Sequence, residues 1–166
     1  VRLLSLRPLV GVGRGSDYVG EHLTESLGSP DLLRLRVLAA LLDAEGLRVR
    51  ADVTTAGEAR SGPALTPTPG MAGGVAAAVN PLVICEDGTV LPYVHGLHPR
   101  FALGHISGGA RGLAESIDHA LPRVVGLLQE AADSLPAADE ECLDWFAHLL
   151  ATSQRTGEEL ALSPAR

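Results

Sequence analysis

The sequence contains no lysine in its 166 residues, and all 13 of its basic residues are arginine. Without a lysine amine, the chain can form no Schiff base with a carbonyl substrate or with pyridoxal phosphate. It also cannot form a Walker A phosphate loop, which needs a lysine. Together with its abundant alanine, glycine and proline, this absence is typical of a GC-rich bacterial genome.

Aromatic residues make up only 3% of the chain, whereas 46% is hydrophobic, so leucine, valine and alanine must form the core. The length predicts one domain, or one and a half, with enough residues for such a core. The two cysteines, Cys85 and Cys142, are too few for a disulfide framework. We interpret each of them as a small core residue.

Basic charge is not in excess, because the formal net charge is −7 and the arginines are scattered along the chain. This excludes a nucleic-acid surface of the usual kind. The N-terminal VRLLSLRPLV is too short, and too interrupted by Arg7 and Pro8, for a signal peptide. No apolar run reaches transmembrane length. We therefore expect a cytoplasmic protein that binds neither nucleic acid nor membrane.

The first third of the chain has the pattern strand, helix, strand. Residues 2–9 are an apolar run, and residues 47–53 alternate between apolar and charged side chains. Between them Ser29 is the expected N-cap of a helix, Pro30 its first residue and Gly46 its C-cap. A helix between two strands predicts a parallel crossover and an α/β fold.

Residues 54–81 are rich in glycine, proline, threonine and alanine, which indicates a linker or extended loop. An apolar hairpin follows, and Asp87-Gly88 is its predicted two-residue turn of type I′. Residues 101–106 are expected to add a third antiparallel strand.

Helices are predicted for the remainder of the chain. The first begins at Gly108-Gly109 and extends to about His119, after which Pro122 either kinks it or starts a second helix to about Ser134. A last helix is expected from Pro136, followed by a polar, frayed tail from Ser153. Its first turns carry acidic residues at 139–141, and its apolar face carries Cys142, Trp145, Phe146 and Leu149.

The glycine-rich segment GVGRG, residues 11–15, follows the first strand and suggests a phosphate loop. Its third glycine comes one position too early for GxGxxG, and the next helix begins only near Pro30. A tight loop that presents Arg14 to a ligand at the carboxyl edge of the sheet fits the spacing better.

Residue types suitable for zinc gather around the hairpin. With a two-residue turn, however, Cys85 would lie opposite Val90, and His95 would be roughly 16 Å from the cysteine. Only the histidines could then form a zinc site; alternatively, they are solvated or bonded to backbone. No Ser/His/Asp set stands out. The candidate ligands are Cys85, His95, His98 and His105. We expect that they form no metal site.

Two stretches together resemble the C-terminal half of a radical S-adenosylmethionine enzyme with a SPASM-type extension. LLSLRPLVGVGRG is similar to a late barrel strand of that family, and the resemblance implies that Gly13, Arg14 and Gly15 help to line the S-adenosylmethionine pocket. NPLVICEDGTVLPYVHGLHPRFALGHI, residues 80–106, is similar to the SPASM hairpin. The matching positions there are the Asp-Gly turn, Pro92, Phe101, Leu103, Gly104 and Ile106.

The chain departs from this family at the cluster ligands. Tyr93 stands where the family has a ligating cysteine, and MAGGVAAAVN lacks the cysteine expected before the first arm. The CxxxCxxC motif that binds the catalytic cluster is absent as well. The resemblance therefore implies a hairpin without its cluster. S-adenosylmethionine would be bound only together with a partner or a missing N-terminal half, and we expect no iron–sulfur cluster in this chain.

We therefore predict an α/β chain in which a βαβ unit of a partial (β/α) barrel is followed by a small antiparallel hairpin unit and C-terminal helices. The expected divisions are the partial barrel at 1–53, the linker at 54–81, the hairpin and helices at 82–152 and a flexible tail at 153–166.

The predicted function is that of the C-terminal portion of a radical S-adenosylmethionine protein that is not active alone. It would form substrate-side walls, with Tyr93 and His95 facing a peptide or small-molecule substrate. We expect it to associate with an N-terminal half-barrel or with itself. The alternative is a non-catalytic adaptor that uses the hairpin unit to hold a peptide or partner protein.

Overall fold

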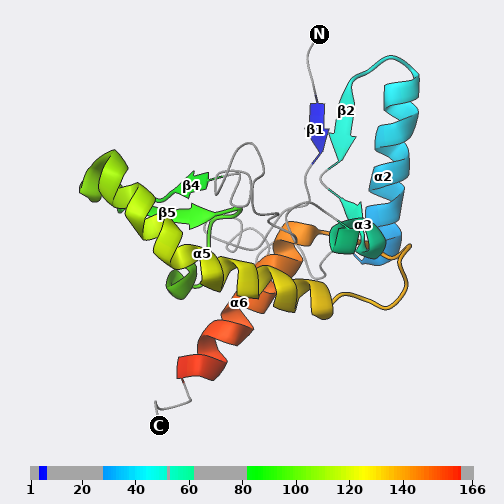
Figure 1. The fold of residues 1–166 in the computed structure, drawn as a ribbon. Helices are drawn as coiled ribbons and strands as arrows, with labels where there is room; N and C mark the ends of the chain where they lie inside the picture. Colours follow the sequence, from blue (N-terminus) through cyan, green and yellow to red (C-terminus); the bar gives the residue numbers. More distant parts are fainter. Residues whose placement is uncertain (1–3, 7–27, 52, 62–81, 162–166) are drawn as a thin grey trace, which may run out of the picture. The chain divides into compact units, whose positions relative to one another are not determined.

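The computed structural model describes residues 4–6, 28–51, 53–61 and 82–161, which form a mixed α/β structure. The chain divides into two compact units, and its segments are coloured along the sequence in Figure 1. The first unit comprises Val1–Ala59 and Pro136–Ala147, and the second comprises Arg60–Leu135 and His148–Arg166. These boundaries differ from the expected divisions, because a segment near the C-terminus returns to the first unit.

The first unit contains the predicted parallel crossover. Strand β1 (Leu4–Leu6) pairs in parallel with β2 (Val49–Ala51), and helix α2 (Ser29–Ala44) connects them in sequence and lies beside β2 (Figure 1). The α/β prediction for this part of the chain is therefore confirmed. A closed or partial barrel is not seen in the described residues, where this sheet has two strands.

Helix α2 begins one residue earlier than its sequence suggests, because Gly28 and not Ser29 is the N-cap. The Ser29 hydroxyl instead accepts a hydrogen bond of 3.2 Å from the Cys142 N–H. The C-cap is Glu45 and not the predicted Gly46, which follows it with φ +87° and donates its N–H to the Asp43 carbonyl. The left-handed residue after the C-cap is a position that glycine occupies without steric cost.

Residues 54–61, expected as part of a linker, are ordered. Strand β3 (Thr54–Thr55) pairs antiparallel with β7 (Cys142–Leu143), and helix α3 (Ala56–Ser61) follows β3. Cys142 therefore lies in a strand and not on a helix face, although it is buried as predicted. The remainder of the expected linker, residues 62–81, lies outside the described residues.

A capping box starts α3. The Thr55 hydroxyl accepts a hydrogen bond from the Glu58 N–H, while the Glu58 carboxylate accepts one from the Thr55 N–H. Arg36 of α2 donates two hydrogen bonds of 2.6 Å to the same carboxylate. These contacts, led by the Arg36 hydrogen bonds, lower the pKa of Glu58 to about 2.

We expect stability of the first unit to depend on Glu58 in acid. Because its pKa is lower in the folded state than the ordinary 4.5, the carboxylate stabilises the fold above that value, and this contribution is lost as the pH falls towards about 2. The pair is largely exposed, so the effect is modest. Thermal unfolding of wild type and Glu58→Gln between pH 5 and pH 2 measures it. The difference between the two proteins should shrink with falling pH, and a constant difference would contradict the assignment.

The second unit contains the predicted hairpin. Strand β4 (Leu82–Ile84) pairs antiparallel with β5 (Thr89–Pro92), which also pairs antiparallel with β6 (Gly104–His105). The hairpin and the third strand are thus confirmed, although β6 is shorter than residues 101–106. The 3-10 turns η1 (Pro99–Phe101) and η2 (Ile106–Gly108) flank β6.

The turn of the hairpin is not the predicted type I′ turn. The Gly88 N–H bonds the Cys85 carbonyl at 2.9 Å, and the Cys85 N–H bonds the Thr89 carbonyl at 2.8 Å, so the loop has three residues. Gly88 has φ +89° and Asp87 has no positive φ, as in a type I turn followed by a bulge. The register is shifted by one residue: Val90 lies opposite Ile84, not Cys85.

A single helix, α5 (Gly109–Asp133), runs through Pro122, where the sequence left a kink or a second helix open. Its buried residues follow one stripe on both sides of the proline, and this packing holds the helix together although Pro122 has no N–H to donate. They are Ala120, Val124, Leu127, Leu128 and Ala131. Helix α5 packs against β6, η1 and η2.

The last helix, α6 (Trp145–Ala161), begins nine residues after the predicted start at Pro136. Asp144 determines this start, since its carboxylate accepts hydrogen bonds from the Phe146 and Ala147 N–H groups. The helix also continues past Ser153, which is fully buried, so a flexible tail does not begin there. Among the described helices, none combines the length and the apolar character needed to cross a membrane.

Candidate functional site

Tyr93 occupies a strained turn directly after β5. Its φ is +64°, and the Val94 N–H donates to the Pro92 carbonyl at 2.7 Å across it, which makes a γ-turn of the rare, strained kind. The side chain is buried, and burial raises the pKa of Tyr93 to about 12. The phenol is therefore neutral at physiological pH and contributes to the core.

The two residues expected to face a substrate are separated by this turn. Tyr93 is 7% exposed, whereas His95 is exposed on the surface beyond the strand end. The expected pocket residues Gly13, Arg14 and Gly15 lie outside the described residues.

His98 has a structural partner on α6. Its Nδ1 accepts a hydrogen bond from the Arg100 N–H at 3.3 Å, which caps η1, and its own N–H donates to the Ser153 hydroxyl. Its ring lies directly over Gly157, so close that a Cβ on that glycine would meet Nδ1 at 2.7 Å. His98 therefore fastens the loop after the hairpin to α6.

His105 lies over the hairpin turn, where both of its ring nitrogens have partners. Nε2 is 2.5 Å from the Asp87 carbonyl oxygen, and Nδ1 is 2.7 Å from the Ser107 hydroxyl. The Ser107 N–H also donates to Nδ1, at 3.1 Å. Both side chains are exposed. The structure thus places the Ser107 hydroxyl against the His105 ring. From the sequence, neither residue was predicted to have a catalytic role.

The carboxylate of Asp87 lies at the same turn and is hydrogen-bonded to Thr89. It accepts hydrogen bonds from the Thr89 N–H at 2.8 Å and from the Thr89 hydroxyl at 2.9 Å. These bonds, with a smaller attraction from His105, lower the pKa of Asp87. The carboxylate thus fixes the turn, and the carbonyl of the same residue holds the histidine.

The residues with suitable types for zinc do not converge. Within the described part of the chain, no three His, Cys, Asp or Glu side chains are grouped as metal ligands would be. Cys85 pairs with Thr89 across the turn, and burial, followed by the nearby charge of Asp87, raises the pKa of its thiol. A raised pKa disfavours the thiolate that binds metals.

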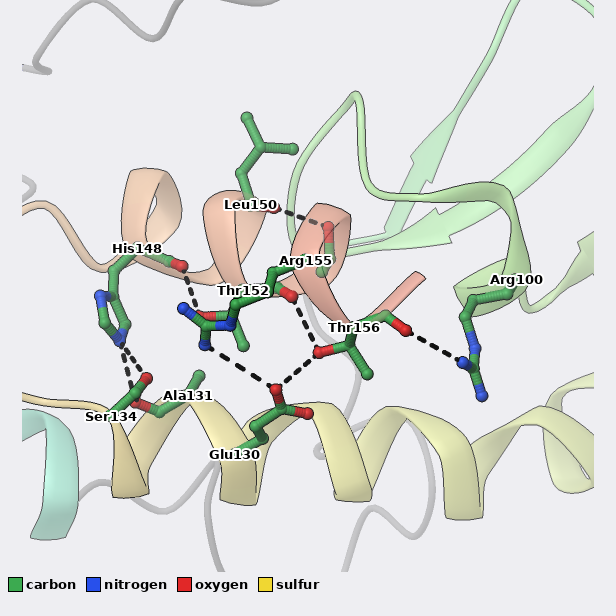
Figure 2. Close-up of polar contacts among 10 residues, drawn as sticks. Arg100, Glu130, Ala131, Ser134, His148, Leu150, Thr152, Arg155 and Thr156 are labelled. Carbon is green, nitrogen blue, oxygen red and sulfur yellow. Dashed lines mark hydrogen bonds and ion pairs between the residues drawn. The ribbon is translucent and has the colours of Figure 1, made fainter. Parts of the chain in front are cut away.

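A row of polar contacts joins α6 to α5 and to η1 (Figure 2). Glu130 accepts a hydrogen bond of 2.7 Å from the Thr156 hydroxyl and forms an ion pair of 3.8 Å with Arg155. His148 Nε2 lies 2.9 Å from the Ala131 carbonyl, and Arg100 donates to the Thr156 carbonyl. Each of these contacts joins a side chain to a backbone carbonyl or to a side chain of the facing helix. The contacts therefore hold the helices together, and packing accounts for them without a catalytic role.

Comparisons with known proteins give no relative for this chain: no family model, no curated protein and no solved structure matches it. Any function must therefore be argued from the motifs and the geometry.

Proposed function

We propose that this chain is the C-terminal portion of a radical S-adenosylmethionine protein, where it forms substrate-side walls and part of the S-adenosylmethionine pocket. The observation that carries the proposal is the order of the elements. A parallel β1–α2–β2 crossover is followed by an antiparallel hairpin with an Asp-Gly turn, and Pro92 ends the second arm. The resemblance in residues 80–106 implies that same hairpin.

The packing explains how such a hairpin unit can be stable without a cluster. In extensions that bind a cluster, the metal–sulfur bonds contribute to folding. Here buried side chains would replace that contribution: Phe101, Leu103 and Val90 are each only 1% exposed, and Tyr93 is buried as well. Burying a side chain of this size stabilises a fold by about 1.5–3 kcal/mol.

The exposed face of α2 supports the need for a partner. Four large apolar side chains of this helix are between 48% and 60% exposed: Leu33, Val37, Leu38 and Leu41. Leu33, Val37 and Leu41 are spaced four residues apart and so share one face of the helix. Parallel sheets are normally covered and extended by neighbouring βα units. An N-terminal half-barrel, or failing that a second copy, would cover these side chains.

The proposal is tested on the assembly from the source organism. The chain, with a C-terminal tag, is purified anaerobically with everything joined or bound to it, and reductive cleavage of S-adenosylmethionine to 5′-deoxyadenosine is measured. We expect cleavage, carried by a CxxxCxxC segment outside these 166 residues. Arg14→Ala should weaken S-adenosylmethionine binding by about tenfold, as expected for a lost charged hydrogen bond. An assembly with no such segment and no cleavage would refute the proposal.

The chain itself is expected to retain no iron after anaerobic reconstitution with iron and sulfide. The raised pKa of the Cys85 thiol and the burial of Cys142 leave no pair of accessible thiolates to ligate a cluster. Iron quantitation on the desalted protein is the measurement, with Cys85→Ala as the matched variant. Stoichiometric iron that is lost in this variant would contradict the prediction.

The alternative, a non-catalytic adaptor that holds a peptide, is favoured by the outer strand of the hairpin. In the described residues β4 pairs with β5 alone, and it exposes 47% of Leu82 and 63% of Ile84. Such an edge can accept an added peptide strand. Under this alternative the purified assembly would contain a peptide but no CxxxCxxC segment, and Ile84→Asp would release that peptide.

A further inference from the structure

Neither proposed role uses the serine–histidine pair at the hairpin tip, although it has the arrangement of an activated nucleophile. Such a nucleophile needs a base within hydrogen-bond reach, and the base needs a third group to orient it. Ser107, His105 and the Asp87 carbonyl supply these parts, with separations of 2.7 Å and 2.5 Å.

The hydrogen bonds determine which nitrogen of His105 is the base. A carbonyl oxygen can only accept, so Nε2 must carry the hydrogen that is donated to Asp87. In the neutral ring Nδ1 then has the lone pair, and this lone pair faces the Ser107 hydroxyl. Capping η2 requires only the bond from the Ser107 N–H, so the cap alone does not account for the short contact with the hydroxyl.

The position of Ser107 in the chain also suits a nucleophile. It lies between strand β6 and helix α5, and Gly109, two residues later, has φ +66°. Serine nucleophiles of hydrolases also lie between a strand and a helix, with glycine two residues after the serine, although Ser107 itself is part of η2 and has no positive φ. Both side chains are exposed, so a small molecule can reach them.

We propose that Ser107 is a nucleophilic serine, activated by His105, that reacts with small, activated carboxylic esters. The Ser107 Oγ attacks the ester carbonyl and its proton passes to Nδ1 of His105. The bond from the acyl carbon to the leaving oxygen breaks, and the imidazolium returns the proton to that oxygen. Water, deprotonated by the same nitrogen, then hydrolyses the acyl-serine, so that ester and water yield acid and alcohol.

A fluorophosphonate probe tests this on the full chain. Ser107 Oγ forms a bond to phosphorus, fluoride leaves, and peptide mass spectrometry identifies the labelled residue. We expect a single adduct on Ser107 and none in Ser107→Ala, while Ser116→Ala is labelled like wild type. His105→Gln should label roughly a hundredfold more slowly, the usual contribution of a general base.

Hydrolysis of p-nitrophenyl acetate is the second readout, with circular dichroism to check that each variant is folded. Wild type should hydrolyse the ester faster than Ser107→Ala. A wild type that is not labelled, or a His105→Gln variant labelled at the wild-type rate, overturns the proposal and leaves His105 as a cap of η2.

Discussion

Replacing Gly157 by alanine is expected to destabilise the protein, although alanine normally stabilises a helix. Gly157 lies in α6 and is buried, and a Cβ there would meet Nδ1 of His98 at 2.7 Å and two ring carbons at still shorter distances. The His98 ring cannot turn away without losing the hydrogen bond that its Nδ1 accepts from the Arg100 N–H, while the Ser153 hydroxyl holds the main chain at His98 by accepting from its N–H.

The expected size follows from two opposing effects. Forcing an extra methyl group into packed surroundings costs up to about 3 kcal/mol. The better helix propensity of alanine offsets about 1 kcal/mol of this. The net loss of about 2 kcal/mol should lower Tm by roughly 4–8 °C in a protein of this size.

Gly126→Ala is the matched control, since Gly126 is a glycine inside α5 where an added Cβ would have no atom within 4 Å. There only helix propensity changes, so Tm should rise. In a His98→Ala background, Gly157→Ala should lose most of its penalty. Equal shifts for the two glycine variants, or an unchanged penalty without His98, would show that the ring does not constrain Gly157.

The contact between His98 and Gly157 illustrates what could not be predicted from the sequence. Each residue has an ordinary local explanation, His98 as a loop histidine and Gly157 as a glycine in a polar segment. Their closeness depends on how the loop after β5 packs on α6, which no local pattern encodes. The same holds for β3 and β7, two short strands whose partners, such as Thr55 and Cys142, are far apart in the chain.

Local patterns predicted the parallel crossover and the hairpin, because each rests on strong signals of alternation and turn residues. They were less reliable where two structures share one signal. Cys142, Trp145, Phe146 and Leu149 have helical spacing, yet Asp144 caps α6 after Cys142 and leaves the cysteine in β7. Similarly, an Asp-Gly pair occurs both in two-residue turns and at the end of three-residue loops.

The candidate site shows the same limit. The motif order in residues 80–106 predicted the hairpin, with Tyr93 directly after the proline that ends its second arm. It did not predict that Tyr93 would be buried in a strained turn. His105 and Ser107 are only two residues apart, and the histidine becomes a base only because the Asp87 carbonyl, across the hairpin, fixes its tautomer. A His-x-Ser sequence between a strand and a Gly-Gly helix start is the local signal that could have indicated the pair.

Replacing Gly88 by alanine should have the largest effect at this hairpin, about 3 kcal/mol. Gly88 has φ +89°, a conformation that costs a residue with a Cβ about 1–2 kcal/mol. A Cβ at this position would also lie 2.8 Å from Cε1 and Nε2 of His105, so the ring must move and lose its bond to Asp87. The overlap adds about 1–2 kcal/mol of the kind seen on overpacking.

Gly46→Ala separates these two contributions. Gly46 has nearly the same φ, +87°, but a Cβ added there would have no atom within 4 Å. This substitution should therefore cost only the backbone term, about 1–2 kcal/mol. The double variant Gly88→Ala/His105→Ala should recover the overlap term, which a double-mutant cycle with the two single variants isolates. Guanidinium unfolding followed by circular dichroism measures each variant. If Gly88→Ala costs no more than Gly46→Ala, His105 does not lie over the turn, and the geometry that makes it a base for Ser107 is wrong.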